Sequence, residues 1–220
     1  MSRGEALIQI HFPQDIQKLE AARTRLKFEE FYLLQLSVLQ QKNIHKTQFK
    51  GYPFTQVGHW FNTFYSDHLP FELTEAQKRV IKEIRFDLGS GRHMNRLVQG
   101  DVGSGKTIVA LMCILLAIDN GFQAALMAPT EILAKQHYQS LLEFTEPMGL
   151  SIALLTGNVK GKQRALVLEG LKDGSIHFVV GTHALIEPTV VFKNIGLSVI
   201  DEQHRFGVAQ RAALWKKNNL

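Results

Sequence analysis

Gly100-Asp-Val-Gly-Ser-Gly-Lys-Thr107 is the stretch that decides the fold. It matches the phosphate-loop pattern G-x-x-x-x-G-K-[ST], and it lies between a predicted strand, Arg96–Gln99, and a predicted helix, Lys106–Asn120. Glycines let several backbone N–H groups point at one phosphate, and the start of the helix adds its positive end. We therefore expect a nucleoside triphosphate here, with Lys106 on its outer phosphates and Thr107 on a magnesium ion. The predicted nucleotide-binding residues of the loop are Gly100, Asp101, Val102, Gly103, Ser104, Gly105, Lys106 and Thr107.

Two adjacent carboxylates, Asp201 and Glu202, follow the apolar stretch Leu197–Ile200. Because the carboxyl ends of parallel strands open on one crevice, we expect both acids beside the phosphate loop. Asp201 is placed to hold magnesium through water, and Glu202 to accept a proton from the attacking water. The predicted catalytic residues are Lys106, Asp201 and Glu202, and the predicted metal ligands are Thr107 and Asp201.

The composition is that of a globular enzyme. The chain has 220 residues, 45% of them hydrophobic and 20% charged, which disfavours intrinsic disorder. A net charge of +5 permits an anionic partner such as nucleic acid. The single cysteine, Cys113, lies in an apolar run and is expected to be buried. No signal-like or membrane-spanning apolar stretch is evident, so we expect a cytoplasmic protein without a membrane partner.

From Phe71 onward, helical and strand patterns alternate, which favours an α/β fold with a parallel sheet flanked by helices. The predicted strands are nearly continuous apolar runs, as expected when helices cover both faces of the sheet. The predicted helices are Thr74–Leu88, Lys106–Asn120, Glu131–Met148 and Lys160–Leu171, and the predicted strands are Arg96–Gln99, Ala124–Ala128, Ser151–Leu155, His177–Val180 and Leu197–Ile200.

The first 69 residues differ in character. Apolar residues recur every three or four positions from Pro13 to Lys42, which predicts a long helix that must pack on a partner domain or on this chain's own core. Asn43–Pro70 is irregular and rich in aromatics, with a short predicted helix, Val57–Asp67, that caps the next domain. We expect its aromatics to pack in a core, although base stacking is an alternative. The predicted domains are therefore 1–69, a helical linker region, and 70–220, a nucleotide-binding domain.

Four stretches resemble motifs I, Ia, Ic and II of superfamily 2 helicases, in the same order, and most closely those of the RecG family of bacterial ATP-dependent DNA helicases. They are Gly100–Thr107, Ala128–His137, Val180–Leu185 and Asp201–Val208. The resemblance implies a RecA-like domain that binds ATP and Mg²⁺. Gln77 would then read the adenine edge with Phe71 near the base, and Gln203 and His204 would couple the nucleotide state to a second motor lobe.

The resemblance also implies a nucleic-acid track along Pro129, Thr130, Gly181 and Thr182, where hydroxyls and backbone N–H groups would contact phosphates without reading sequence. Thr130 is equally suited to cap the helix that follows it. A structural role is favoured for His183. The basic loop Thr156–Arg164 is either a phosphate contact or a solvated loop.

The function implied is that of the first motor lobe of a helicase that remodels forked or branched duplex DNA, with its single strands, in recombination and repair. The sequence ends soon after motif II, so we expect a fragment that lacks the second RecA-like lobe and the wedge domain of this family. Such a lobe is not expected to unwind DNA alone. The alternatives are an Mfd-like DNA translocase, a phosphate-loop enzyme without nucleic acid, and a catalytically silent interaction module.

Overall fold

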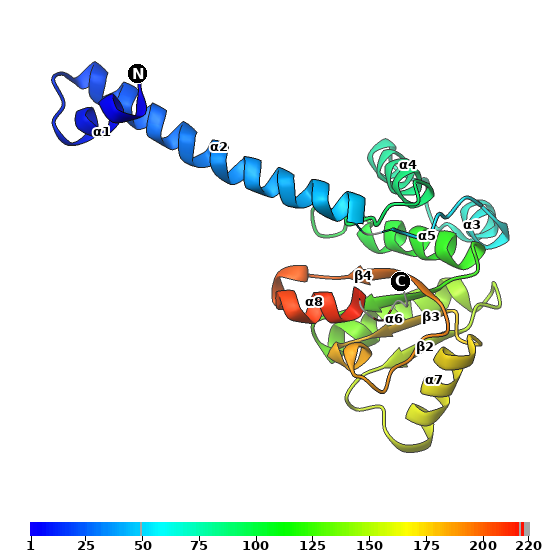
Figure 1. Cartoon of the computed structure of the whole chain (residues 1–220). Coiled ribbons are helices and arrows are strands. Elements are labelled where there is room, and N and C mark those ends of the chain that lie inside the picture. The colour runs from blue at the N-terminus through cyan, green and yellow to red at the C-terminus, as the bar shows by residue number, and fades with distance from the viewer. Residues whose placement is uncertain (49, 216, 218–220) are drawn as a thin grey trace. The chain divides into compact units, whose positions relative to one another are not determined.

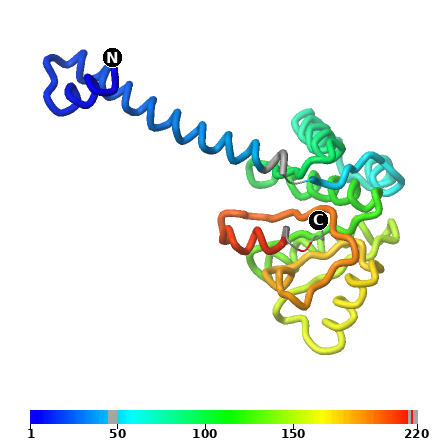
Figure 2. The backbone as a smooth tube through the Cα atoms, viewed as in Figure 1, coloured from blue at the N-terminus to red at the C-terminus, as the bar shows by residue number. Residues whose placement is uncertain are grey.

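The computed structural model describes residues 1–48, 50–215 and 217. The chain forms two compact units, Met1–Lys50 and Gly51–Leu220, and each is described by itself. The backbone path through each unit can be followed in Figure 2.

The first unit is a helical hairpin of α1 (Arg3–His11) and α2 (Ile16–Gln48). Ser2 caps α1 in a capping box with Glu5, which is a sequence signal for the start of a helix. The predicted long helix is confirmed, but it begins at Ile16 rather than in the turn at Pro13. The reason is local: the carboxylate of Asp15 accepts a hydrogen bond from the Lys18 N–H at 2.7 Å and so starts the helix.

Small side chains let the two helices of this hairpin approach each other. Ala6 of α1 and Ala22 of α2 are fully buried, and Arg3 of α1 forms an ion pair with Glu29 of α2 at 3.1 Å. Farther along α2, large apolar side chains such as Phe28 and Phe31 are exposed. The apolar periodicity therefore predicted the helix, while most of its apolar surface is not buried by α1.

The second unit is an α/β domain, as expected (Figure 1). Its described residues form a four-stranded parallel sheet in the order β2-β3-β1-β4. The strands are β1 (Gln123–Met127), β2 (Ile152–Leu155), β3 (Phe178–Gly181) and β4 (Ile195–Ile200). The helices are α3 (His59–Thr63), α4 (Glu75–Gly89), α5 (Lys106–Asp119), α6 (Glu131–Thr145), α7 (Gly161–Asp173) and α8 (Val208–Trp215), with short π- or 3-10 turns at η1 (Phe64–His68), η2 (His183–Ile186) and η3 (Gln203–Arg205).

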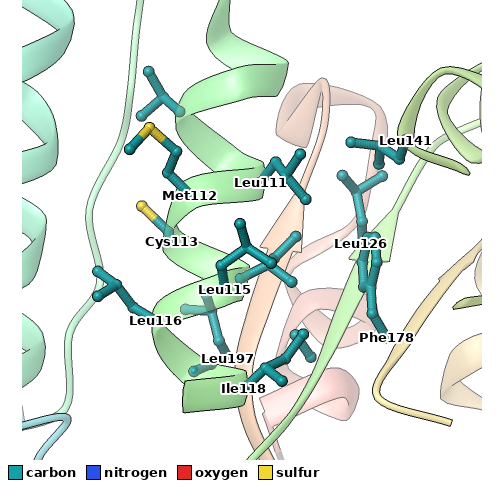
Figure 3. Close-up of a cluster of buried hydrophobic side chains, with 14 of the residues drawn as sticks. Leu111, Met112, Cys113, Leu115, Leu116, Ile118, Leu126, Leu141, Phe178 and Leu197 are labelled. Atoms are coloured by element: carbon teal, nitrogen blue, oxygen red, sulfur yellow. The ribbon is translucent and has the colours of Figure 1, made fainter. Parts of the chain in front are cut away.

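Two apolar clusters cover the two faces of the sheet, because successive strand residues point to opposite sides. Leu126 and Phe178 pack with α4, α5 and α6 on one face, whereas Met127 and Val179 pack with α7 and α8 on the other. Ten residues of α5 are buried. Figure 3 shows the reason: Leu111 and Leu115 of α5 face the strands, while other apolar side chains of the helix point away from them into a second packed layer. Cys113 is buried in this helix, as expected.

The aromatic segment before α4 belongs to this unit. The predicted helix at Val57–Asp67 is confirmed as α3 followed by η1, and Phe54 and Phe64 are buried, as the core-packing interpretation required. Asp119, the last residue of α5, fixes the segment. Its carboxylate accepts hydrogen bonds from the N–H groups of Gly58, Trp60 and Phe61 at 2.9–3.0 Å.

The predicted strand at Arg96–Gln99 is wrong, since these residues form no strand. The guanidinium of Arg96 binds the carboxylates of Glu83 and Asp87 on α4, and these hydrogen bonds raise its pKa above the ordinary value. The segment is thereby held by α4 instead of joining the sheet. The segment still contributes to the core, because Val98 packs against the buried cluster.

Candidate nucleotide site and adjoining sheet edge

The phosphate loop is a tight turn that ends in the first residue of α5. Gly103 and Gly105 have φ of 79° and 76°, in the left-handed region that suits glycine. Gly105 is the N-cap of α5, so the helix starts directly at Lys106 with its positive end toward the loop. Val102 at the tip is fully exposed. The loop thus has the backbone form and the helix dipole that a phosphate group requires.

Lys106 lies across its own loop. Its ammonium donates to the carbonyls of Gly100 at 2.8 Å and Asp101 at 2.6 Å, and to the hydroxyl of Ser104 at 3.3 Å. A phosphate bound here would take over at least some of these hydrogen bonds. The lysine is therefore already folded toward the position where the loop can hold an anion.

Gln77 clamps the loop from α4. Its side-chain Nε2 donates to the Ser104 carbonyl at 2.9 Å, and its Oε1 accepts from the Thr74 N–H at 2.8 Å as part of a capping box. A Cβ placed on Gly105 would stand 2.4 Å from this Nε2 and near the ring of Phe71. Glycine is thus favoured at 105 chiefly by its positive φ angle, and Gln77 and Phe71 both border the loop.

The acid pair lies at the end of β4. The Asp201 N–H continues the sheet by donating to the Met127 carbonyl at 2.9 Å. Oδ1 of Asp201 accepts from the Glu202 N–H at 2.9 Å, and Oδ2 lies 2.9 Å from Nε2 of His137 on α6. The hydrogen bond from His137 is the main cause that lowers the pKa of the Asp201 carboxyl, against the opposing effect of burial, and the hydrogen bond from the Glu202 N–H lowers it further. Contacts from α6 and from the next residue therefore both favour the ionised carboxylate.

Glu202 has an unusual backbone. Its φ of 46° and ψ of 52° are left-handed, a conformation that costs a non-glycine residue of order 1 kcal/mol. Its exposed carboxylate forms an ion pair with Nε of Arg205 at 2.8 Å. Strain of this kind concentrates at functional positions, and it turns Glu202 away from the direction that the strand would impose.

Gln203 and His204, the predicted coupling residues, are exposed in η3, directly after the acids. Arg211 of α8 stabilises this turn, because its Nη1 donates to the carbonyls of Gln203 at 3.0 Å and Phe206 at 2.7 Å. The two predicted side chains are thus exposed on a hydrogen-bonded turn next to the acids.

All four strands end level with one another. Met127, Gly181, Leu155 and Ile200 are register partners across the sheet. The residues that follow them are therefore placed along one edge, which carries Pro129 and Thr130 after β1, Thr156 after β2, Thr182 after β3 and the acids after β4. The predicted nucleic-acid residues and the predicted catalytic acids share this edge.

The individual residues of the predicted track differ in exposure. Thr130 is exposed and caps α6 by accepting from the Leu133 N–H at 3.3 Å, so its capping role is confirmed. Gly181 is required by packing, since a Cβ there would stand 2.2 Å from the Leu155 carbonyl oxygen. Thr182 is only 1% exposed, and neither its hydroxyl nor that of Thr156 has a hydrogen-bond partner among the described residues. Pro129 is half-buried and His183 exposed.

The basic loop after β2 is tied to the start of α6. The Glu131 carboxylate accepts from the N–H of Asn158 at 3.2 Å and also binds its side-chain amide. Arg164 forms an ion pair with Glu187 at 2.6 Å, whereas Lys160 and Lys162 are exposed. Two basic side chains are therefore exposed where this loop passes into α7, Lys160 directly before the helix and Lys162 in its first turn.

Three contacts of this site were missed in the sequence analysis: His137 with Asp201, Arg205 with Glu202, and Arg211 with η3. His137 stands 64 residues before Asp201, so no local pattern signals the pair. The described residues hold no group of three or more His, Cys, Asp and Glu side chains that could bind a metal. Within those residues, no helix is long and apolar enough to cross a membrane.

Comparisons with known proteins agree with this geometry. The family model of DEAD/DEAH box helicases matches residues 74–219. The chain is 53% identical to the ATP-dependent DNA helicase RecG of Synechocystis over 97% of its own length, and 46% and 47% identical to those of Thermotoga maritima and Bacillus subtilis over 98% and 97%. It spans 26%, 27% and 31% of the lengths of these relatives. The resemblance to the RecG family is thus confirmed.

Solved structures give the same result. A structure of RecG bound to a three-way DNA junction matches with a TM-score of 0.82 and 45% identity, over 92% of this chain and 27% of that one. The UvsW helicase from bacteriophage T4 matches with a TM-score of 0.52 and 17% identity, over 72% of this chain and 55% of that one, which is a likeness of fold alone.

Proposed function

Because the chain belongs to the DEAD/DEAH box helicase family, we propose that it is the first RecA-like, ATP-binding lobe of a RecG-type DNA helicase. Such an enzyme couples ATP hydrolysis to remodelling of branched DNA and stalled replication forks during recombination and repair. The observation that carries the proposal is the shared strand-end edge, where the acids that follow β4 lie in line with the residues that follow β1, β2 and β3.

The residues at the loop fit an ATP–magnesium complex. The N–H groups of the glycine-rich turn and Lys106 would hold the phosphates, while Thr107 and Asp201 would hold the ion, both through the hard oxygen ligands that it prefers. The bound ion would supply neutralisation of the charge that develops on the phosphates. Hydrogen bonds to both oxygens of Asp201 favour its ionised form, which such a role requires.

Glu202 is the proposed general base. Its carboxylate is at the sheet edge, next to Asp201, and would accept a proton from water as that water attacks the terminal phosphate. Its ion pair with Arg205 is exposed, so the pair is weak and can open when a nucleotide binds. Turnover also requires charge stabilisation from an arginine of a second RecA-like lobe, which is a proposed partner.

Gln77 is the proposed adenine reader. A side-chain amide offers two N–H donors and two acceptor lone pairs. The contacts with Ser104 and Thr74 use one of each. One donor and one acceptor remain, and adenine presents the complementary pair at N7 and the N6 amino group. The existing contacts therefore hold the amide without exhausting it.

DNA is the proposed macromolecular partner, as forked or branched duplex and as single strands. The DNA strand would be lined by Pro129, Thr130, Gly181 and Thr182. The exposed Lys160 and Lys162 would add contacts to its phosphates. Since the Thr182 hydroxyl is buried and has no hydrogen-bond partner within the described part of the chain, it would become available only through a small local movement. Gln203 and His204 would couple this track to the second lobe, and a wedge domain is the other proposed partner.

We further propose a functional division that differs from the two compact units, with a helical linker region at 1–69 and the ATP-binding domain at 70–220, and we propose a cytoplasmic location. The test is ATP turnover by a protein that joins this chain to a second RecA-like lobe, with forked, duplex and single-stranded DNA. The strongest stimulation is expected from forks, and indifference to all three would contradict the DNA proposal. A failure of the chain to bind ATP in the presence of Mg²⁺ would contradict the nucleotide proposal.

A further inference from the structure

His137 contacts the candidate site, although it belongs neither to the phosphate loop nor to the acid pair and no role in the site was predicted for it. Its Nε2 lies 2.9 Å from Oδ2 of Asp201, and the side chains of His137 and Asp201 are 18% and 34% exposed. An ionised carboxylate can only accept hydrogen bonds, so the histidine is the donor. The two residues belong to different elements, α6 and the end of β4, and are brought together by the sheet.

The Asp201 carboxylate is held at both oxygens. The Glu202 N–H occupies Oδ1 at 2.9 Å, and His137 occupies Oδ2. The plane and direction of the carboxylate are thereby fixed, yet each oxygen keeps a further lone pair for a magnesium-bound water. A fixed carboxylate with spare acceptor capacity is what an outer ligand of a metal requires.

The His137 contact completes this restraint. Without it, only the Glu202 N–H at Oδ1 would hold the Asp201 carboxylate, and Oδ2 would be free to rotate. The acid would then no longer be fixed in the orientation that a magnesium-bound water requires.

The fold does not depend on this contact. Ala134 and Leu141 are buried and hold α6 on the sheet, and Thr130 caps its start. His137 and Asp201 both keep partial solvent exposure, so their bond adds little to stability in comparison. The placement of His137 is therefore better explained by the carboxylate than by the packing of the helix.

We propose that His137 is a positioning residue that holds Asp201 in the orientation needed for a magnesium-bound nucleotide. The inference rests on the proposed function, because it takes Asp201 as a ligand of that metal. It predicts that loss of the Nε2 donor weakens metal binding while the fold and the phosphate loop persist.

The test compares His137→Phe, which keeps a ring but no donor, with His137→Gln, whose amide nitrogen can reach a similar position. Gln136→Ala, at an exposed neighbour on α6, is the matched control. Each variant of the chain is titrated with Mn²⁺ in the presence of a non-hydrolysable ATP analogue, with electron paramagnetic resonance as the readout. Melting temperatures are recorded in parallel, and His137→Ala serves as a second donor-free variant if His137→Phe does not fold.

We expect His137→Phe to lower the affinity for the metal about 10- to 100-fold, as is typical when a group that orients a metal ligand is lost. His137→Gln should recover most of this loss, and Gln136→Ala should leave the affinity unchanged. Equal metal affinity in the wild type and in folded His137→Phe would overturn the inference alone, and so would equal losses in His137→Phe and His137→Gln. A wild-type chain that binds no metal with the nucleotide would overturn both the inference and the proposed function.

Discussion

The two sides of the candidate site are built by different means. On the loop side, Gly100–Thr107 forms its turn within one contiguous stretch, and Lys106 bonds to carbonyls five and six residues away. On the acid side, Asp201 owes its place to Met127 on a neighbouring strand and to His137 on α6. One side is local geometry that the residue types nearly dictate, and the other exists only once the sheet has formed.

This difference separates binding from chemistry. The loop presents donors and a positive charge to phosphate groups in any state of the reaction, so it should govern affinity for the nucleotide. On the acid side, Glu202 acts on a proton that is transferred only during hydrolysis, so it should govern turnover, whereas Asp201 acts on the metal that binds together with the nucleotide. Variants on the two sides are therefore expected to change different measured quantities.

The largest effect is expected from Glu202→Gln on the acid side. Removing a general base typically costs 10²–10⁴-fold in rate, so ATP turnover, measured with a second motor lobe present, should fall by about that factor. The affinity for ATP should stay within about threefold of the wild type, because the amide keeps the shape and sits outside the phosphate loop. Glu143→Gln, at an exposed position on α6, is the control. Turnover at the wild-type rate would mean that another residue is the base.

A smaller effect is expected from Lys106→Ala on the loop side, and it should appear in the affinity for the nucleotide rather than in turnover. Hydrogen bonds to charged groups contribute about 1.5–3 kcal/mol, so the affinity for ATP should fall about 10- to 100-fold. The measurement is a calorimetric titration with ATP and Mg²⁺, and Lys135→Ala, an exposed lysine of α6, is the control. Unchanged affinity would break the comparison, because the loop would then not be the element that binds the phosphates.

The same contrast explains what the sequence could predict. The glycines of the phosphate loop, the cap at Thr74 and the alternation of apolar runs are local signals, and they correctly located the loop, the helices α2 to α7 and the strands β1 to β4, but not α1 or α8. The strand expected at Arg96–Gln99 failed because Arg96 binds Glu83 and Asp87 on α4. An apolar run cannot report such a competing partner.

Within the site, the residue types of both motifs were predictable, but their contacts were not. Nothing near Asp201 in the sequence points to His137, and nothing near Glu202 indicates its left-handed backbone. The contact between His137 and Asp201 requires that the sheet has formed, and the backbone of Glu202 is set where β4 passes into η3. The missed features thus lie mainly on the acid side, where tertiary structure sets the geometry.

The smallest effect is expected from Gln77→Glu, and it sharpens the comparison because Gln77 lies on the loop side but binds no phosphate in the proposal. Glutamate keeps the acceptor for the Thr74 N–H, so the capping box survives, while the donor to Ser104 is lost. A neutral hydrogen bond contributes about 0.5–1.5 kcal/mol, so ATP affinity should fall about 2- to 10-fold. Inorganic triphosphate, which has no base, distinguishes the two duties of this side chain in the same titration. If Gln77 reads adenine, the affinity for triphosphate should change much less than that for ATP. Equal losses for both ligands would show that Gln77 acts only by clamping the loop, and adenine recognition would then have to be assigned elsewhere.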